Sequence, residues 1–299
     1  MARVLITGAN GFTGRHLVER LACDGHELFS LAHHGNEVSS PLVSRTWVAD
    51  LRDLAALTGI MAELRPERVV HLAAIANVAH GDVSDLYSSN IVGTRNLLHA
   101  LATSGSIPTA VLIASSANIY GNRREGVLTE DMAPAPANDY GVTKVACELL
   151  AQVYSDRLPI ITTRPFNYTG RGQSNDFLIP KIIAHVRNRA PVIELGNIEV
   201  ARDFSDVRAV VDAYARLLDS PAAIGQTLNV CSGQARTLAE VLNLTERISG
   251  HHMEVRINPN FVRSDEVKTL CGSRARLESV IGPVPMPDLA ETVTWMLDA

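Results

Sequence analysis

The sequence predicts an α/β protein with a doubly wound parallel sheet and a smaller, discontinuous C-terminal lobe. Three observations predict this architecture. Short β-branched runs alternate with amphipathic helical patterns up to about residue 164, a glycine-rich turn follows the first run directly, and the alternation breaks down afterwards. A chain of 299 residues can bury the core of one large or two small domains.

The first strand, residues 3–7, runs into a glycine-rich turn and then into a helical pattern. In that context the glycines predict a Rossmann-type dinucleotide site. The first permits a tight turn, the second admits a pyrophosphate, and the third lets the helix pack on the strand. The helix N-terminus adds free N–H groups and positive potential. The residues expected to bind a dinucleotide here are Gly8, Gly11, Phe12, Thr13 and Gly14.

The next two strands, residues 27–32 and 46–49, are expected to carry the adenosine end of the cofactor. The first of them ends in His33-His34 without the acid that an NAD site usually has, so NADP(H) is favoured and NAD(H) stays possible. His34, Arg15 or Asn36 could contact a 2′-phosphate, and a metal site at the histidine pair is not expected. Asp50, followed by Leu51, could accept from the adenine amino group or cap the next helix.

The fourth strand, residues 68–72, ends in Leu72-Ala73-Ala74, which are expected to line the cofactor's path because the two alanines are small. A helix expected over residues 82–103 carries Asn90 in its interior. A buried amide needs hydrogen-bond partners, so Asn90 either braces a neighbouring strand end or contacts the cofactor.

The fifth strand, residues 109–114, delivers Ser115 and Ser116 to the edge of the sheet where ligands bind in parallel α/β folds. A loop is expected over residues 126–137. The helix that follows carries Tyr140 and Lys144, and the i, i+4 spacing puts both side chains on one face. A hydroxyl, a phenol and an ammonium are thereby brought to a place where a carbonyl could be reduced.

Beyond a sixth strand at residues 160–163 the pattern becomes irregular. Helices are expected at 177–188, 207–218, 238–248 and 289–297, β-like pieces at 191–195 and 199–204, and a strand at 227–230 that returns to the main sheet. The predicted dinucleotide-binding domain is 1–164 plus about 205–230. The predicted substrate-binding lobe is 165–204 plus 231–299.

Composition argues against several functional classes. The net charge of −5 gives no electrostatic footprint for nucleic acid, and no apolar run is long enough to cross a bilayer. The N-terminus lacks the pattern of a signal peptide, so a cytoplasmic location is expected. The four cysteines lie far apart without metal-ligand spacing, which indicates reduced thiols and no metal site.

Taken together, Gly8-x-x-Gly11-x-x-Gly14, Asn90, Tyr140-x-x-x-Lys144 and Arg164-Pro165-Phe166-Asn167 resemble the extended short-chain dehydrogenases/reductases that act on nucleotide sugars. The similarity runs over nearly the whole chain. Four stretches resemble the group of GDP-4-dehydro-6-deoxy-mannose reductases and GDP-mannose 4,6-dehydratases: RPFNYTGRGQSNDFLIPKI, ARDFSDVRAVVDAY, LNVCSGQARTLAEVL and VRSDE.

The resemblance implies roles for individual residues. Ser116 donates to the substrate carbonyl, Tyr140 is the acid, and Lys144 holds the nicotinamide ribose and, with the oxidised nicotinamide, lowers the phenol's pKa. Pro165 lies against the cofactor. The residues implied in binding the substrate are Asn118, Asn167, Lys181, Arg202, Arg263 and Glu266. A homodimer through the helices carrying Asn90 and Tyr140 is also implied.

Asn118 separates the possible reactions. A 4,6-dehydratase needs a carboxylate two positions after the catalytic serine to remove a C5 proton, and an amide is no base. The prediction is therefore NAD(P)H-dependent reduction of GDP-4-dehydro-6-deoxy-D-mannose to GDP-D-rhamnose or GDP-6-deoxy-talose. The alternatives are a nucleotide-sugar 4-epimerase with tightly bound NAD and a non-catalytic nucleotide sensor, and the latter is disfavoured because Tyr140 and Lys144 are both present.

Two departures from the family pattern concern the substrate. Ile75-Ala76 replace a Gln-Ser pair that can reach the sugar, and Gly170-Arg171-Gly172 replaces Gly-Pro-Gly. Arg171 could add a cation near the substrate's diphosphate or be solvated.

Overall fold

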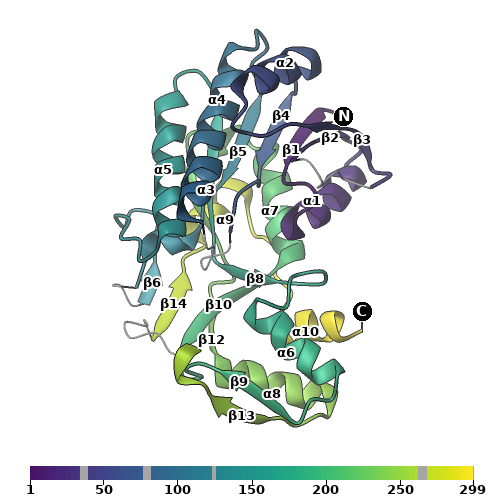
Figure 1. Ribbon diagram of the computed structural model, residues 1–299, viewed down its shortest axis with the longest axis vertical. Coiled ribbons are helices and arrows are strands. Elements are labelled where there is room, and N and C mark those ends of the chain that lie inside the picture. Colours follow the sequence, from purple (N-terminus) through teal and green to yellow (C-terminus); the bar gives the residue numbers. More distant parts are fainter. Residues whose placement is uncertain (34–39, 77–81, 123–125, 262–267, 299) are drawn as a thin grey trace.

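The structure, a computed structural model, describes residues 1–33, 40–76, 82–122, 126–261 and 268–298. Its larger unit is a fully parallel seven-stranded sheet in the order β3-β2-β1-β4-β5-β7-β11 (Figure 1). The strands are β1 (Arg3–Thr7), β2 (Glu27–Ala32), β3 (Val43–Val48), β4 (Arg68–His71), β5 (Ala110–Ala114), β7 (Ile160–Pro165) and β11 (Thr227–Val230). Strand order reverses between β1 and β4, and such a switch point opens a crevice at the carboxyl ends of the strands.

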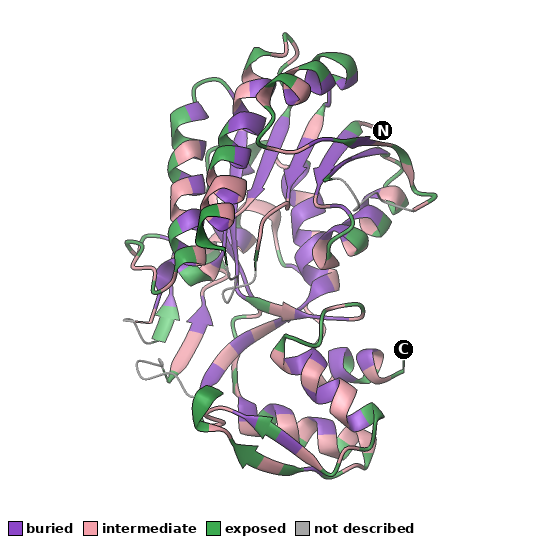
Figure 2. Cartoon of the chain, viewed as in Figure 1, coloured by how far each residue is buried: buried purple, intermediate pink, exposed green. Residues whose placement is uncertain are grey.

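Helices cover both faces of this sheet, which is why its central strands are buried nearly end to end (Figure 2). One face packs on α1 (Phe12–Cys23), α7 (Val207–Leu218) and α9 (Ala275–Ile281). The other packs on α2 (Leu54–Leu64), α4 (Gly93–Thr103) and α5 (Asp139–Tyr154). Ahead of α4 lie the short helix α3 (Val83–Tyr87) and a π-helical turn, Ser88–Val92.

The smaller unit lies beyond the carboxyl edge of the sheet (Figure 1). Its main sheet has the order β12-β10-β14-β6, with β8 also paired to β10, and β9 pairs with β13. These strands are β6 (Gly126–Leu128), β8 (Asn167–Thr169), β9 (Val192–Leu195), β10 (Ala201–Asp206), β12 (Ala235–Thr237), β13 (Glu254–Ile257) and β14 (Thr269–Gly272). Helices α6 (Leu178–Arg187), α8 (Leu238–Ser249) and α10 (Leu289–Leu297) enclose a separate core.

The predicted architecture is confirmed: a Rossmann-type parallel sheet and a smaller C-terminal lobe made of discontinuous pieces. Two local expectations were wrong. The segment expected as a loop from residue 126 begins with β6, which pairs with β14, and the helix expected over 82–103 is interrupted by the π-helical turn. Because β6 joins the second sheet although it falls within 1–164, the exact domain division stays a prediction.

Local sequence explains how the site-bearing helices begin. The Asn138 side chain accepts from the N–H of Gly141 at 2.8 Å and so caps α5. Helix α1 begins after Gly11 with no side-chain cap, which leaves its first N–H groups directed at the crevice. Among the described residues, no helix is both long and apolar enough to cross a membrane.

Candidate active site

Two adjoining cavities lie along the carboxyl edge of the large sheet. The glycine-turn cavity, about 480 Å³, extends from the β1–α1 turn to the ends of β2 and β3. The serine cavity, about 530 Å³, extends from the same turn to Ser116 and Tyr140. Both are lined by Gly8, Gly11 and Ala74, so together they form one elongated cleft of the kind a dinucleotide and a second ligand require.

The glycine turn fits a dinucleotide because it leaves no room for side chains. Gly8 has a φ of 74°, and a Cβ there would lie 2.8 Å from the backbone N of Ala73. A Cβ on Gly14 would lie 2.2 Å from the carbonyl oxygen of Gly8. The strand ends and helix α1 are therefore as close as backbone allows, and a diphosphate can approach the uncapped helix N-terminus. The predicted Phe12, Thr13, Leu72 and Ala73 also line the two cavities.

The predicted catalytic trio comes together in the serine cavity. Ser116 follows β5 and caps a short 3-10 turn, Ala117–Tyr120, while Tyr140 and Lys144 lie one turn apart on α5. The Lys144 ammonium donates to the carbonyl oxygen of Ala114 at 2.8 Å and lies 5.7 Å from the centre of the Tyr140 ring.

Hydrogen bonding around Ser116 indicates where its proton points. Its Oγ accepts from the backbone N–H and from the side-chain Nδ2 of Asn118, both at 3.1 Å. These two bonds use the lone pairs of the hydroxyl, so Ser116 is left as a donor. Ser116 acts on the neighbouring phenol as a hydrogen-bond donor, which lowers the pKa of Tyr140. Its one proton can be given to the phenol oxygen or to a carbonyl oxygen bound in the cavity.

Burial raises the pKa of Tyr140 to about 12, opposed by the hydrogen bond with Ser116. Burial lowers the pKa of Lys144. In the chain alone, desolvation is the largest influence on the pKa of Tyr140, and the joint effect expected of Lys144 and the oxidised nicotinamide stays a prediction. A phenol protonated at neutral pH is the form that can give a proton to a developing alkoxide.

The part of the glycine-turn cavity expected to hold the adenosine contains a cluster of charged side chains that the sequence did not predict. Asp50 accepts from Arg52 Nε at 3.0 and 2.9 Å and from its backbone N at 2.8 Å, and these bonds lower the pKa of Asp50 to about 2. Arg52 also pairs with Asp85 at 3.1 Å, and His33 lies 3.6 Å from Asp50. Asp50 is thus tied to Arg52 rather than left to adenine alone. Arg52 directly follows Asp50-Leu51, and this proximity in the sequence could have predicted the ion pair.

Asn90 takes the bracing role that the sequence left open. Its Oδ1 accepts from Ile75 N at 2.8 Å, and its Nδ2 donates to Ile75 O and Thr143 Oγ1, both at 3.1 Å. Fully buried, it joins the end of β4 to α5 without lining either cavity. Asn90 therefore positions the cleft walls.

The predicted substrate residues are dispersed. Asn118 and Asn167 line the serine cavity, and so does Pro165, which was predicted to lie against the cofactor. Lys181 donates to the carbonyl of Glu194 at 2.7 Å and lies 4.9 Å from the centre of the Phe261 ring, so its ammonium is held at β9. Arg202 lies on β10 and donates to Ala201 O at 2.8 Å. His34, Asn36, Arg263 and Glu266 lie outside the described residues.

Arg171 does not extend into the serine cavity. Its Nε donates to the carbonyl of Trp295 at 2.5 Å and its guanidinium stacks 5.0 Å from that indole. The lining of the serine cavity instead includes an apolar wall beside the polar Asn167, Thr169 and Gln173, and sequence spacing did not predict this wall. Its members are Phe166, Phe177, Leu178, Ile179, Pro180 and Phe204.

Comparison with known proteins agrees with this geometry. The model of the NAD dependent epimerase/dehydratase family matches residues 4–231. The chain belongs to this family. As a member it is an NAD(P)-dependent enzyme of the extended short-chain dehydrogenase/reductase type.

Two relatives of the chain have names that refer to GDP-linked sugars. GDP-6-deoxy-D-talose 4-dehydrogenase of Aggregatibacter actinomycetemcomitans is 32% identical, covering 94% of this chain and 91% of the relative. GDP-6-deoxy-D-mannose reductase of Pseudomonas aeruginosa is 35% identical, covering 99% and 96%.

Two solved structures are also similar. A Burkholderia cenocepacia protein provisionally described as an epimerase is 49% identical with a TM-score of 0.93, covering 99% of this chain and 97% of that one. RMD from Pseudomonas aeruginosa, complexed with NADPH, is 30% identical with a TM-score of 0.84, covering 100% and 97%.

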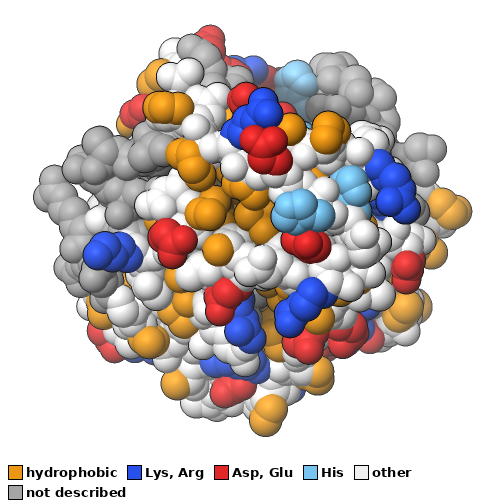
Figure 3. All heavy atoms as spheres, turned by 90° about the horizontal axis from the view of Figure 1, so that it is seen from below, with side chains coloured by type: hydrophobic (Ala, Val, Ile, Leu, Met, Phe, Trp, Pro, Cys, Tyr) orange, Lys and Arg blue, Asp and Glu red, His pale blue; other side chains and the backbone are white. Residues whose placement is uncertain are grey.

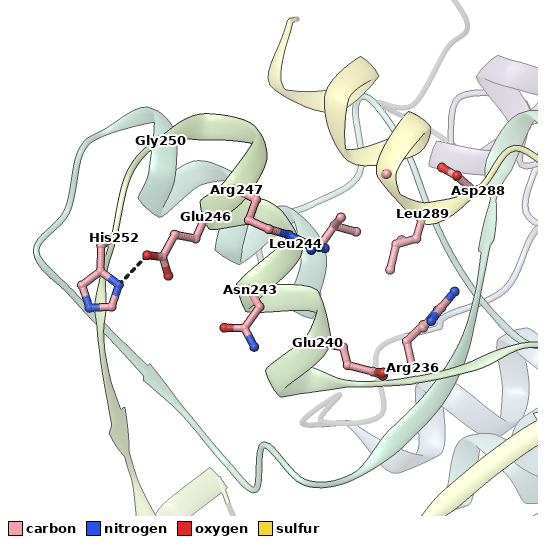
Figure 4. A pocket seen from close by; sticks show the side chains of 11 residues that line it. Arg236, Glu240, Asn243, Leu244, Glu246, Arg247, Gly250, His252, Asp288 and Leu289 are labelled. Atoms are coloured by element: carbon pink, nitrogen blue, oxygen red, sulfur yellow. Dashed lines mark ion pairs between the residues drawn. The ribbon is translucent and has the colours of Figure 1, made fainter.

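A further hollow of this family member, about 790 Å³, lies between α8 and the start of α10 (Figure 4). Both signs of charge surround it, including Arg236, Glu240 and the His252–Glu246 ion pair at 2.9 Å. Figure 3, which views the molecule from below, likewise has acidic and basic side chains interspersed. Of the predicted site residues that the structure describes, none lines this hollow, so the chemistry is assigned to the cleft.

Proposed function

We propose that the chain modifies a nucleotide sugar, using NAD(P)H to reduce the 4-keto group of a nucleotide-linked 6-deoxyhexose. The proposed substrate is GDP-4-dehydro-6-deoxy-D-mannose, and the product is GDP-D-rhamnose or its C4 epimer, GDP-6-deoxy-talose. One observation carries the proposal: Ser116, Tyr140 and Lys144 meet in a cavity whose described lining residues include no Asp or Glu. Dehydration would need such a carboxylate to remove the C5 proton.

In the proposed mechanism a bound nicotinamide cofactor supplies the hydride to C4. Ser116, fixed by Asn118, gives its one proton to the C4 oxygen when the substrate is bound. Tyr140 donates its proton to that oxygen, so the carbonyl becomes a secondary alcohol, and the phenolate that remains is stabilised by the neighbouring Lys144 ammonium. Lys144 also holds the cofactor ribose.

The apolar wall supports a 6-deoxy sugar. A C6 methyl group buried against side chains such as Phe177 and Ile179 gains about 0.8 kcal/mol, whereas a C6 hydroxyl would lose its hydrogen bonds to water there.

Asn167 is proposed to contact the sugar or diphosphate. Arg202 and Arg263 are proposed for the diphosphate and Glu266 for the nucleotide ribose. Lys181 stays a diphosphate candidate only if it leaves Glu194.

NADP(H) is the favoured cofactor, with NAD(H) possible. The end of β2 itself has no acid to repel a 2′-phosphate, and Arg52 and His33 line the glycine-turn cavity beside Asp50 and Asp85, the carboxylates with which they pair. His34 is proposed as a further contact. The RMD complex with NADPH supports this preference. We expect Arg52→Ala to raise the KM for NADPH more than the KM for NADH.

The direct test gives purified enzyme GDP-4-dehydro-6-deoxy-D-mannose and NADPH and follows nicotinamide absorbance. Tyr140→Phe should lose at least about 100-fold in kcat, because it removes the proton donor without changing the ring. Tyr154→Phe, on the same helix, should retain the wild-type rate. Undiminished turnover by Tyr140→Phe would refute the assignment. Melting shifts with GDP-, UDP-, dTDP- and CDP-sugars would identify the nucleotide.

The second candidate is a nucleotide-sugar 4-epimerase, supported by the provisional description of the Burkholderia cenocepacia structure. An epimerase regenerates its cofactor in each cycle and therefore retains it. NAD that co-purifies with the protein, together with interconversion of C4 epimers without added NADPH, favours this candidate. Strict dependence on added NADPH favours the reductase.

A homodimer is proposed through α4, α5 and the π-helical turn. Val142, Leu149 and Val153 form an exposed apolar stripe on one side of α5, and Val92 of the π-helical turn is also exposed. Leu149→Glu should shift the mass measured by light scattering from dimer to monomer, and a wild-type monomer would refute the proposal. A cytoplasmic location is also proposed and can be checked by cell fractionation.

A further inference from the structure

A seam of direct contacts joins helix α1 to the smaller unit. The hydroxyl of Tyr168, on β8, lies 2.7 Å from Thr13 Oγ1, and its ring stacks on Phe12 with 5.8 Å between ring centres and 14° between planes. Farther along α1, His16 hydrogen-bonds the carbonyl of Arg171 at 2.9 Å and its ring lies 5.9 Å from that of Trp295. The seam consists of Phe12, Thr13 and His16 against Tyr168, Arg171 and Trp295.

The seam touches both halves of the proposed ternary complex. Thr13 lies in the uncapped first turn of α1, where a dinucleotide diphosphate would bind. Tyr168 directly follows Asn167, and both line the serine cavity. Strand β8 in turn pairs with β10, which carries Phe204 of the apolar wall. Thr13 is therefore linked to the substrate side of the cavity through the side chain of Tyr168.

The two hydroxyls also have an unused proton. In a hydrogen bond between two hydroxyls one O–H is donated, and the other remains for a third group. The adjacent first-turn N–H groups of α1 are donors as well. An anionic oxygen in the glycine turn would accept from both sources, so its presence would fix the geometry of the Thr13–Tyr168 pair.

We propose that Tyr168 is a positioning residue that couples cofactor occupancy to nucleotide-sugar binding. The diphosphate of the dinucleotide orients the Thr13 hydroxyl, Thr13 fixes Tyr168, and Tyr168 sets β8 and Asn167 for the sugar nucleotide. The inference rests on the proposed function. Because binding coupling is reciprocal, each ligand raises the affinity for the other by the same factor.

The first test uses NADP⁺ alone and a single-tryptophan background. The chain has two tryptophans. In Trp47→Phe the remaining Trp295 reports on the seam, because its ring lies 5.9 Å from the His16 ring and 5.0 Å from the Arg171 guanidinium. NADP⁺ should change Trp295 emission, and Tyr168→Phe or Thr13→Val should abolish that change and weaken NADP⁺ binding by about 3- to 10-fold. Thr13→Ser should keep both the emission change and the NADP⁺ affinity, and Tyr154→Phe should behave as wild type.

A double-mutant cycle separates coupling from general damage. If the two hydroxyls act as a pair, Tyr168→Phe with Thr13→Val should bind NADP⁺ no more weakly than either single variant. Losses that multiply, or single variants with wild-type affinity and emission change, would overturn the proposal. These readouts need no turnover, so they stand even if the proposed reaction is wrong.

The second test measures GDP-mannose and UDP-glucose affinity with and without saturating NADP⁺ by calorimetry. At least one sugar nucleotide should bind about 3- to 10-fold more tightly with NADP⁺, and Tyr168→Phe should remove that gain. Equal affinities with and without NADP⁺ in the wild type would overturn the coupling. Preference for UDP-glucose would contradict the proposed nucleotide and leave the coupling supported.

Discussion

Two glycine-to-alanine substitutions, each inside a helix, should have opposite effects on stability. In Gly14→Ala the new methyl carbon would lie 2.2 Å from Gly8 O and 2.6 Å from Ala9 Cα, whereas ordinary contact begins at 3.4 Å. Helix α1 must therefore withdraw from the β1 turn by more than about 1 Å, the difference between those distances. Overpacking of this kind costs about 1–3 kcal/mol of unfolding free energy. It also removes the helix N-terminus from a bound diphosphate, so we expect at least about 10-fold weaker cofactor binding.

Gly59, inside α2, is the matched control. No heavy atom lies within 4 Å of a Cβ built there. Gly59→Ala should raise the unfolding free energy by about 0.5–1 kcal/mol, because alanine loses less backbone entropy in a helix. Urea unfolding without cofactor, followed by circular dichroism, gives the stabilities, and calorimetry with NADP⁺ gives the affinities. Wild-type stability and affinity in Gly14→Ala would refute the reasoning from backbone proximity.

Three further outcomes follow from buried polar groups. Burial lowers the pKa of His71 from 6.5 in the unfolded chain to about 3 in the folded one, so His71 takes up a proton on unfolding below pH 6.5. The free energy of unfolding should therefore fall by about 2 kcal/mol from pH 7 to pH 5. In His71→Asn, urea unfolding should show no such dependence on pH. Arg164→Met leaves buried Glu148 without its 2.7 Å partner and should destabilise by about 3–5 kcal/mol, and adding Glu148→Leu should restore part of this in the same assay. Because the pKa of Tyr140 is raised to about 12, kcat for reduction should stay level between about pH 7 and 9, and an alkaline loss there would contradict a protonated phenol.

Sequence reasoning was most successful where function depends on short spacing. The glycine turn, the serine at a strand end and the Tyr140–Lys144 pair are each encoded within about one turn or strand, and backbone periodicity alone brings them to the cleft. The argument against a dehydratase likewise depends on one position, Asn118, and stays a prediction.

The hydrogen-bond partners of individual side chains could not be predicted in this way. The sequence places Arg171 and Lys181 close to residues of the cleft. Their hydrogen bonds are instead accepted by Trp295 and Glu194, each more than ten positions away. The strand character of β6 depends on β14, which lies well over a hundred residues later. Such partners are decided by tertiary packing, which a local pattern does not contain.

The position of β11 at the sheet's edge has a consequence for synthesis of the protein on the ribosome. Strand β7 can pair on that side only when residues 227–230 have been translated, and α7, which covers one face, also comes late. Until then an apolar strand edge is open to other chains. We expect nascent chains ending before residue 227 to stay protease-sensitive and to need a chaperone, and chains extended past residue 230 to gain protection. Equal protection of both lengths would show that the first strands fold without their last neighbour.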